Sequence, residues 1–169
     1  MLKIKYPRTA LFILLAVIPM YFIMKSPGNF IPIVFVLGMS VFFLSILIIR
    51  NQSWFKPILL GKWNFFSDRY EETITFDLDA DTLFDKFLEV LPQTDLRIRY
   101  ADKKKGEIMA NSKISIWSFG ENVYFELVPV GEATQVKITS TALFQAVAWG
   151  KNEKNVSSFL HRFDKSLTI

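Results

Sequence analysis

Three carboxylates alternate along one short segment near the middle of the chain. The segment reads Asp77-Leu78-Asp79-Ala80-Asp81, which is similar to the start of a calcium-binding loop. Such a loop needs glycine at its sixth position and glutamate at its twelfth, where this chain has Thr82 and Leu88. The pattern favours instead a strand that runs into a helix, with the acids at the positive helix end. We therefore predict no metal site.

The single histidine, His161, lies in the last amphipathic segment, beside apolar positions 159, 160 and 163. Since those positions are expected to be buried, His161 should face outward or lie at the rim. A general base needs a nucleophile or an orienting group nearby, and the sequence supplies none. An enzyme would need several scattered residues to converge in one cleft, drawn from Asp77, Asp79, Glu107, Glu126 and His161. We predict no catalytic residue, no cofactor and no enzyme activity.

Two further groups of side chains have both a binding and a plain structural interpretation. Trp117, Phe119 and Trp149 would either line a small-molecule pocket beneath the last helix or fill the core. The run Lys103-Lys104-Lys105 would either contact anionic lipid headgroups or form a solvated hairpin tip. The structural interpretation is favoured in both cases. Residues 70–169 contain more acids than Lys and Arg, so we predict no nucleic-acid partner.

Two long uncharged segments precede this part of the chain, at residues 9–24 and 30–49. At about 1.5 Å per residue they span roughly 24 Å and roughly 30 Å, the second of which matches the bilayer core. A turn of Lys, Ser, Pro, Gly and Asn joins them at 25–29. The absence of a small-residue cleavage site after Met24 argues against a cleaved signal peptide. Residues 1–50 are therefore predicted to form a two-helix transmembrane hairpin.

The basic residues around the two segments predict an orientation. They flank the hairpin on its outer ends and are almost absent from its turn: Lys3, Lys5 and Arg8 precede it, Arg50, Lys56 and Lys62 follow it, and Lys25 lies in the turn. The positive-inside rule then places both termini in the cytoplasm. We predict a multi-pass protein of the bacterial inner membrane.

The predicted spans contain no ionisable residue, whereas transporters and channels place polar or charged groups at depth. Gly38 and Ser40 are small residues that allow close helix packing. The hairpin is thus predicted to be an anchor in the lipid bilayer or a docking surface for a larger membrane protein.

Residues 51–69 mix aromatic and basic side chains. Trp54, Lys56, Lys62 and Trp63 are the residue types that the headgroup region of a membrane favours. The segment has two open interpretations, a connector on the membrane surface or a loop that docks its aromatics on the following domain.

Residues 70–169 show the periodicities of an α+β domain. Apolar alternation predicts strands, and a spacing of three to four residues predicts helices. The expected order is β-α-β-β-β-β-α, with strands near 73–78, 96–100, 107–119, 123–127 and 136–138, a helix near 82–91 and a last helix from 150–152. An antiparallel sheet with both helices on one face covers its apolar side with the least chain.

The start of the last helix reads Trp149-Gly150-Lys151-Asn152-Glu153-Lys154-Asn155-Val156. This stretch resembles the tail of a group of uncharacterised small bacterial membrane-anchored proteins. The resemblance covers roughly 70–169, and it implies a bacterial source and a domain shape but no activity. The element order also looks like a reduced helix-grip or TATA-binding-protein-like domain, and such folds are mostly binding modules.

These observations predict a non-enzymatic accessory or assembly subunit of a bacterial inner-membrane complex, docked through the hairpin. The alternative is a membrane-tethered domain that binds lipid or another apolar ligand between sheet and last helix.

Overall fold

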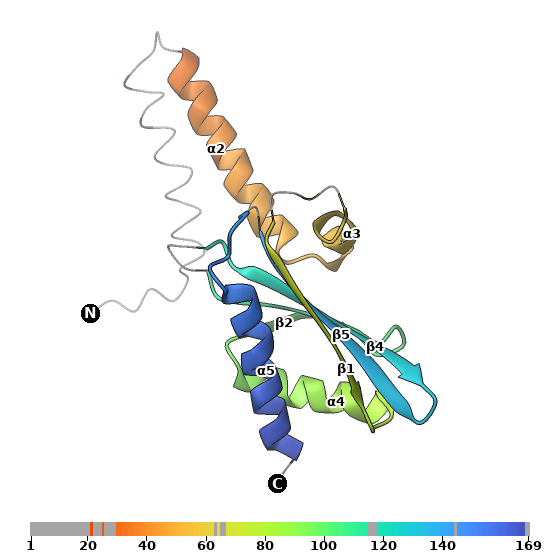
Figure 1. Ribbon diagram of the computed structural model, residues 1–169. Coiled ribbons are helices and arrows are strands. Elements are labelled where there is room, and N and C mark those ends of the chain that lie inside the picture. Colours follow the sequence, from red (N-terminus) through yellow and green to blue (C-terminus); the bar gives the residue numbers. More distant parts are fainter. Residues whose placement is uncertain are drawn as a thin grey trace, which may run out of the picture. The chain divides into compact units, whose positions relative to one another are not determined.

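The computed structural model describes residues 21, 25, 30–62, 64, 67–114, 118–143 and 145–167. The chain divides into two units, Met1–Ile48 and Ile49–Ile169. The second unit contains a five-stranded antiparallel sheet of order β1-β5-β4-β3-β2 (Figure 1). Its elements are η1 (Ser53–Phe55), α3 (Lys56–Leu59), β1 (Arg69–Phe76), α4 (Ala80–Val90), η2 (Leu91–Gln93), β2 (Arg97–Asp102), β3 (Glu107–Asn111), β4 (Glu121–Val130), β5 (Ala133–Ala142) and α5 (Lys151–Leu167). The α+β class, the antiparallel sheet and the order of its elements are as predicted.

The helix α2 spans Phe30–Ile49, the bounds predicted for the second apolar segment. The hydroxyl of Ser40 donates to the carbonyl of Val36, one turn earlier, at 2.9 Å. A Cβ added at Gly38 would meet no atom within 4 Å. Close packing of another helix against Gly38 and Ser40 therefore stays a prediction. The first predicted span, 9–24, lies outside the described residues except for Tyr21.

No single helix in the described ranges is long and apolar enough to cross a membrane. Ile33–Ile49 meets the length and composition required only when it is taken together with the helical segment Ser53–Leu59 that follows it in the chain. On this finding the predicted multi-pass localisation in a bacterial inner membrane, with both termini cytoplasmic, is wrong.

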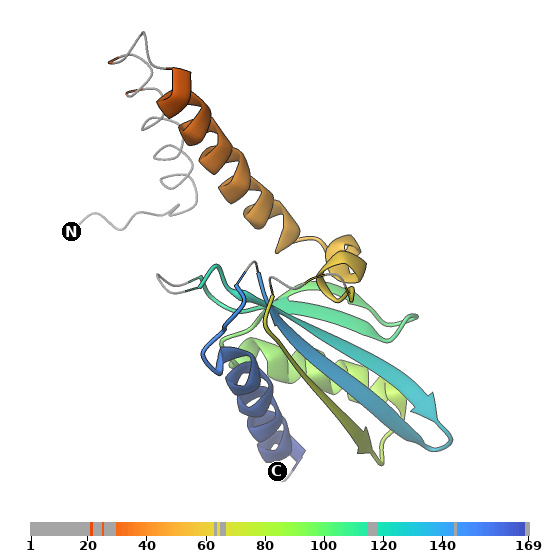
Figure 2. The same cartoon turned by 45° about the horizontal axis from the view of Figure 1, so that its top comes forward.

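The sheet buries one face because its side chains alternate. Ile108 pairs with Phe125, and Phe125 pairs with Ile138, so that these three side chains form a row across β3, β4 and β5. Both helices, α4 and α5, lie over this face (Figures 1 and 2). The buried residues of the sheet and the two helices form one hydrophobic cluster.

Phenylalanine rings fill the space between the sheet and the helices. The ring centre of Phe87 on α4 lies 5.6 Å from that of Phe125 and 4.9 Å from those of Phe159 and Phe163. All three contacts are edge-to-face, an arrangement that aromatic rings favour. The face that would have held an apolar ligand is therefore occupied by the protein's own side chains.

The predicted cap of the first domain helix is confirmed. Asp79 precedes α4, and its Oδ1 accepts a hydrogen bond from the backbone N–H of Thr82 at 2.9 Å. Hydrogen bonds from the side chain and the backbone N–H of Thr82 lower the pKa of the Asp79 carboxyl, as expected for a carboxylate that satisfies a free helix N–H. The alternating acids thus end a strand and begin a helix.

Candidate functional site

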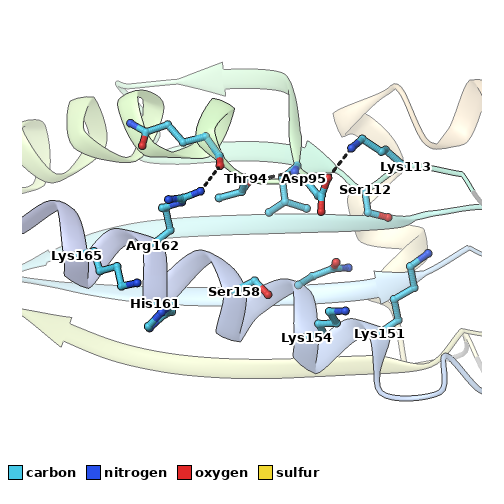
Figure 3. A pocket seen from close by; sticks show the side chains of 13 residues that line it. Thr94, Asp95, Ser112, Lys113, Lys151, Lys154, Ser158, His161, Arg162 and Lys165 are labelled. Carbon is cyan, nitrogen blue, oxygen red and sulfur yellow. Dashed lines mark hydrogen bonds and ion pairs between the residues drawn. The ribbon is translucent and has the colours of Figure 1, made fainter.

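A groove of about 990 Å³ runs between α5 and the segment Gln93–Leu96, which leads into β2. Figure 3 shows the side chains of α5 along one side and Thr94, Asp95 and Lys113 along the other. The side chains that line the groove include six basic ones: Lys113, Lys151, Lys154, His161, Arg162 and Lys165. Asp95 is the one acid among the lining residues. The groove is therefore strongly cationic.

The amphipathic pattern of α5 places five of these basic residues in the groove. Val156, Phe159 and Phe163 are buried against the sheet, and residues three and four apart share one face of a helix. The basic residues follow the same spacing on an adjoining stripe, from Lys151 to Lys165. At about 1.5 Å per residue, that stripe is roughly 21 Å long.

Few acids neutralise the stripe. On the side opposite α5, Lys113 Nζ lies 2.5 Å from Asp95 Oδ1, and from α5 Arg162 donates across the groove to the backbone carbonyl of Gln93 at 3.4 Å. Within the described part of the chain, neither Lys154 nor Lys165 has a carboxylate within 4.0 Å. The hydrogen bond and charge of Lys113, together with the charge of Lys154, lower the pKa of Asp95.

Lys151 lines the groove at the start of α5; its side chain is 32% exposed, but the charged Nζ atom is itself buried. This atom makes no hydrogen bond to any described residue, although it lies 3.4 Å from Glu121 Oε1. Glu121 is fully buried and already accepts hydrogen bonds from Ser118 at 2.6 Å, from Asn155 at 3.3 Å and from Ser112. An ammonium has three N–H donors, so Lys151 retains unused donor capacity.

Arg50 holds the two segments that flank Glu121, at Ser112 and at Phe119. The arginine is only 5% exposed and donates to the carbonyls of Ser112 and Phe119 at 2.6 Å and 2.9 Å. Gly120 has φ +88°, and a Cβ there would lie 2.9 Å from Arg50 Nη1. A side chain at this position would therefore displace the guanidinium, so the tight turn before β4 requires glycine.

The opposite face of the sheet holds a different cation. Lys56 Nζ lies 2.6 Å from Glu107 and 2.5 Å from Glu126 and 5.9 Å from the centre of the Tyr124 ring. Burial lowers the pKa of Lys56, but the hydrogen bonds and charges of the two glutamates outweigh it, and the pKa is raised overall. Burial also raises the pKa of Tyr124 to about 12, against a smaller lowering by the hydrogen bond from Asn122.

The residues predicted to contact a membrane surface lie in different environments. Trp54 is 65% exposed and stacks on Phe55, Lys62 is exposed, and Lys56 is ion-paired on the sheet. Trp63 lies outside the described residues. Of these residues, Lys56 docks on the domain. Contact of the others with a membrane surface stays a prediction.

The residues considered for catalysis do not converge. Glu107 and Glu126 meet on the outer face of the sheet around Lys56, Asp79 caps α4, and exposed His161 lines the groove on α5. The predicted outward orientation of His161 is confirmed. No group of three or more metal-ligating side chains occurs among the described residues.

The groove was not predicted from the sequence. The spacing of Lys151, Lys154 and Lys165 beside the apolar stripe of α5 was a usable signal, since it places them on one side of the helix. The opposite wall, Asp95 and Lys113, could not be read from spacing because it comes from distant parts of the chain. Trp149, expected in a pocket or the core, is instead 84% exposed, and Trp117 lies outside the described ranges.

No protein-family model and no curated protein matches the chain. The solved structures similar to it include Ara h 8.0201, with 10% identity, a TM-score of 0.48 and coverage of 61% of this chain and 99% of the other. The Zhui aromatase/cyclase from Streptomyces sp. R1128 has 11% identity, a TM-score of 0.37 and coverage of 58% and 87%. The protein TTHA0849 from Thermus thermophilus has 13% identity, a TM-score of 0.36 and coverage of 60% and 92%. Since these TM-scores are below 0.5, the site is interpreted from this chain's own residues.

Proposed function

We propose that the unit Ile49–Ile169 is a non-catalytic binding module whose ligand is a small anionic molecule seated in the α5 groove. The observation that supports this most directly is the unused cationic capacity of the groove. The buried ammonium of Lys151 makes no hydrogen bond to the described residues, and exposed Lys154 and Lys165 have no carboxylate among them within 4.0 Å. A carboxylate or phosphate would accept hydrogen bonds from these donors, and charge-assisted hydrogen bonds are the strongest kind.

The electrostatics of the groove favour an anion over the apolar ligand that was the alternative sequence prediction. An apolar molecule would need the space beneath α5, which the rings of Phe87, Phe159 and Phe163 occupy. The scattered positions of Glu107, Asp79 and His161 support a binding role over a catalytic one. The accessory-subunit prediction depended on the localisation corrected above, and a larger membrane partner stays a prediction.

The test is a calorimetric titration of the full chain with inorganic tripolyphosphate, a compact polyanion. We expect saturable binding at one site per chain. Lys154→Gln and Lys165→Gln should each weaken it about two- to fivefold, as expected for partly exposed charge pairs. Affinity should fall as salt is added, because exposed charges are screened.

The matched control is Lys104→Gln, which removes an exposed lysine at the β2–β3 hairpin tip. The change in net charge is the same, but the residue does not line the groove. Equal weakening by Lys104→Gln and Lys154→Gln would mean that the anion binds the protein's overall charge, and the proposal would fail. Lack of saturable binding in the unaltered protein would also refute it.

A further inference from the structure

Trp149 has a backbone conformation that its side chain does not favour. Its φ is +49°, and it is the one non-glycine residue with positive φ in the described ranges. Gly150 follows with φ +73°, and the N–H of Lys151 donates to the carbonyl of Ala148 at 2.9 Å. Two central residues with positive φ characterise a type I′ turn, where Asn, Asp and Gly are preferred. A bulky residue there is strained.

Hydrogen bonds from both sides of the turn hold it to Asp68. The N–H of Ala148 donates to Asp68 Oδ2 at 3.0 Å, and the side-chain amide of Asn152 donates to the carbonyl of Asp68 at 2.9 Å. These contacts fix the backbone on either side of Trp149 and do not involve its indole. The turn could therefore form with asparagine or glycine, so the local fold does not explain a tryptophan.

Packing does not explain this tryptophan either. The side chain is 84% exposed, the largest exposed fraction among the large hydrophobic residues described. It borders a small hollow of about 190 Å³ together with Ser118, Gln145, Lys151 and Lys154. Lys151 and Lys154 also line the α5 groove, so the hollow adjoins the cationic end of that groove. An exposed aromatic ring thus lies beside the two cations where an anion is proposed to bind.

We propose that Trp149 is the stacking platform for the groove's ligand, and that this ligand is a planar aromatic anion. The inference deepens the proposed function and rests on it. The acidic group lies between Lys151 and Lys154, while the ring enters the adjoining hollow and stacks on the indole. The hollow is of a suitable size, since a cavity of about 150 Å³ takes one benzene ring. Stacked aromatic pairs contribute beyond the area that they bury.

The experiment compares two probes that carry the same charge. Trimesate is a benzene ring with three carboxylates, and its cyclohexane counterpart has the same three carboxylates on a saturated ring. Both are titrated calorimetrically into the full chain, with the quenching of tryptophan fluorescence as a second signal. We expect trimesate to bind about two- to tenfold more tightly, the range for one aromatic pair.

Variants at Trp149 separate a stacking role from a structural one. In Trp149→Asn the preference for trimesate should disappear, while the affinity for the saturated probe stays within about twofold. Its thermal midpoint should be equal or higher, because asparagine tolerates positive φ. Trp149→Phe should retain most of the preference. Trp54→Ala removes another exposed indole, which borders a different hollow with Tyr100 and Tyr124, and should match the unaltered protein.

Four results would overturn the assignment. Equal affinity for the two probes, with tripolyphosphate still bound through Lys154, would refute the aromatic ligand and leave the anion-binding function intact. A preference that persists in Trp149→Asn would place the ring elsewhere. A lower thermal midpoint in Trp149→Asn, with equal loss of both probes, would make the tryptophan structural. Failure of tripolyphosphate as well as both ring compounds would refute the function itself.

Discussion

The two faces of the sheet use lysine in opposite ways. On the outer face, the side chain of Lys56 is only 19% exposed and is held between Glu107 and Glu126. On α5, Lys154 and Lys165 are exposed and have no carboxylate within 4.0 Å among the described residues. The first arrangement satisfies the cation within the fold and ties the connector to the sheet. The second leaves its charge available to a ligand.

Lys151 combines the two arrangements. It is ion-paired with buried Glu121 at 3.4 Å, yet its ammonium makes no hydrogen bond within the described part of the chain. Glu121 already accepts hydrogen bonds from hydroxyl and amide groups, so its ion pair with Lys151 balances the buried charge without fixing the position of the ammonium. Removal of the Glu121 charge should therefore affect mainly stability, whereas removal of exposed lysines on α5 should affect mainly binding.

The largest effect on stability should come from Glu121→Gln. The substitution keeps the shape but removes the charge that balances Lys151, and it presents an amide to the donor hydroxyls of Ser112 and Ser118. Loss of one partner from a buried ion pair costs about 3 kcal/mol or more. We expect the free energy of unfolding, measured by urea denaturation, to fall by about that amount.

The matched control is Glu132→Gln in the exposed turn between β4 and β5. Surface substitutions of this kind change stability by within about 0.5 kcal/mol. If Glu121→Gln were as mild as Glu132→Gln, the ion pair between Glu121 and Lys151 would not stabilise the fold, which would contradict its assignment here.

Lys56→Met should have the second-largest effect. It leaves Glu107 and Glu126 facing each other without a cation, and hydrogen bonds to charged groups contribute about 1.5–3 kcal/mol each when formed. Because both glutamates are about one-third exposed, we expect a smaller loss of about 1–2 kcal/mol. Lys62→Met is the control, since Lys62 is an exposed residue of the same connector. Tripolyphosphate binding should not change in either variant.

The contribution of Lys56 should also depend on pH. Its pKa is raised above 10.5 in the folded protein, so the stabilisation is fully present below pH about 10.5 and is lost as pH rises through the folded-state pKa. The stability difference between the unaltered protein and Lys56→Met should therefore stay constant from neutral pH to about 10 and shrink above it. A difference that already shrank at neutral pH would contradict the ion-pair assignment.

The sequence predicted elements better than it predicted the site, for physical reasons visible in particular residues. Periodicity is a local property, so the buried stripe Val156, Phe159 and Phe163 could be read directly, and so could the cap at Asp79. The groove depends on Asp95 and Lys113 facing α5, which is decided by sheet pairing. No local sequence pattern specifies how far these two residues lie from α5.

Trp149 and Lys56 show two other limits of local patterns. Tryptophan beside an apolar helix suggests core or pocket, but α5 begins only at Lys151, and the turn before it directs Trp149 outward. Lys56 in an aromatic, basic segment suggests a membrane surface, but the same residue types also suit docking on a sheet with exposed glutamates. Composition alone does not distinguish a lipid headgroup from Glu107 and Glu126.

The smallest effect on stability, and of the opposite sign, should come from Lys154→Gln. Lys154 is in the first turn of α5, where the helix dipole disfavours a cation, and it lies three residues after Lys151, where like charges repel. Its attraction to Asp95 is between exposed groups screened by solvent, so it offsets only part of these two effects. Its removal should raise the free energy of unfolding by a few tenths of a kcal/mol at low salt, and the gain should vanish as salt screens the charges. The same variant should weaken tripolyphosphate binding. A stability loss above about 0.5 kcal/mol would instead show that Lys154 is held by the fold in the way Lys56 is, and the contrast between the two faces would fail.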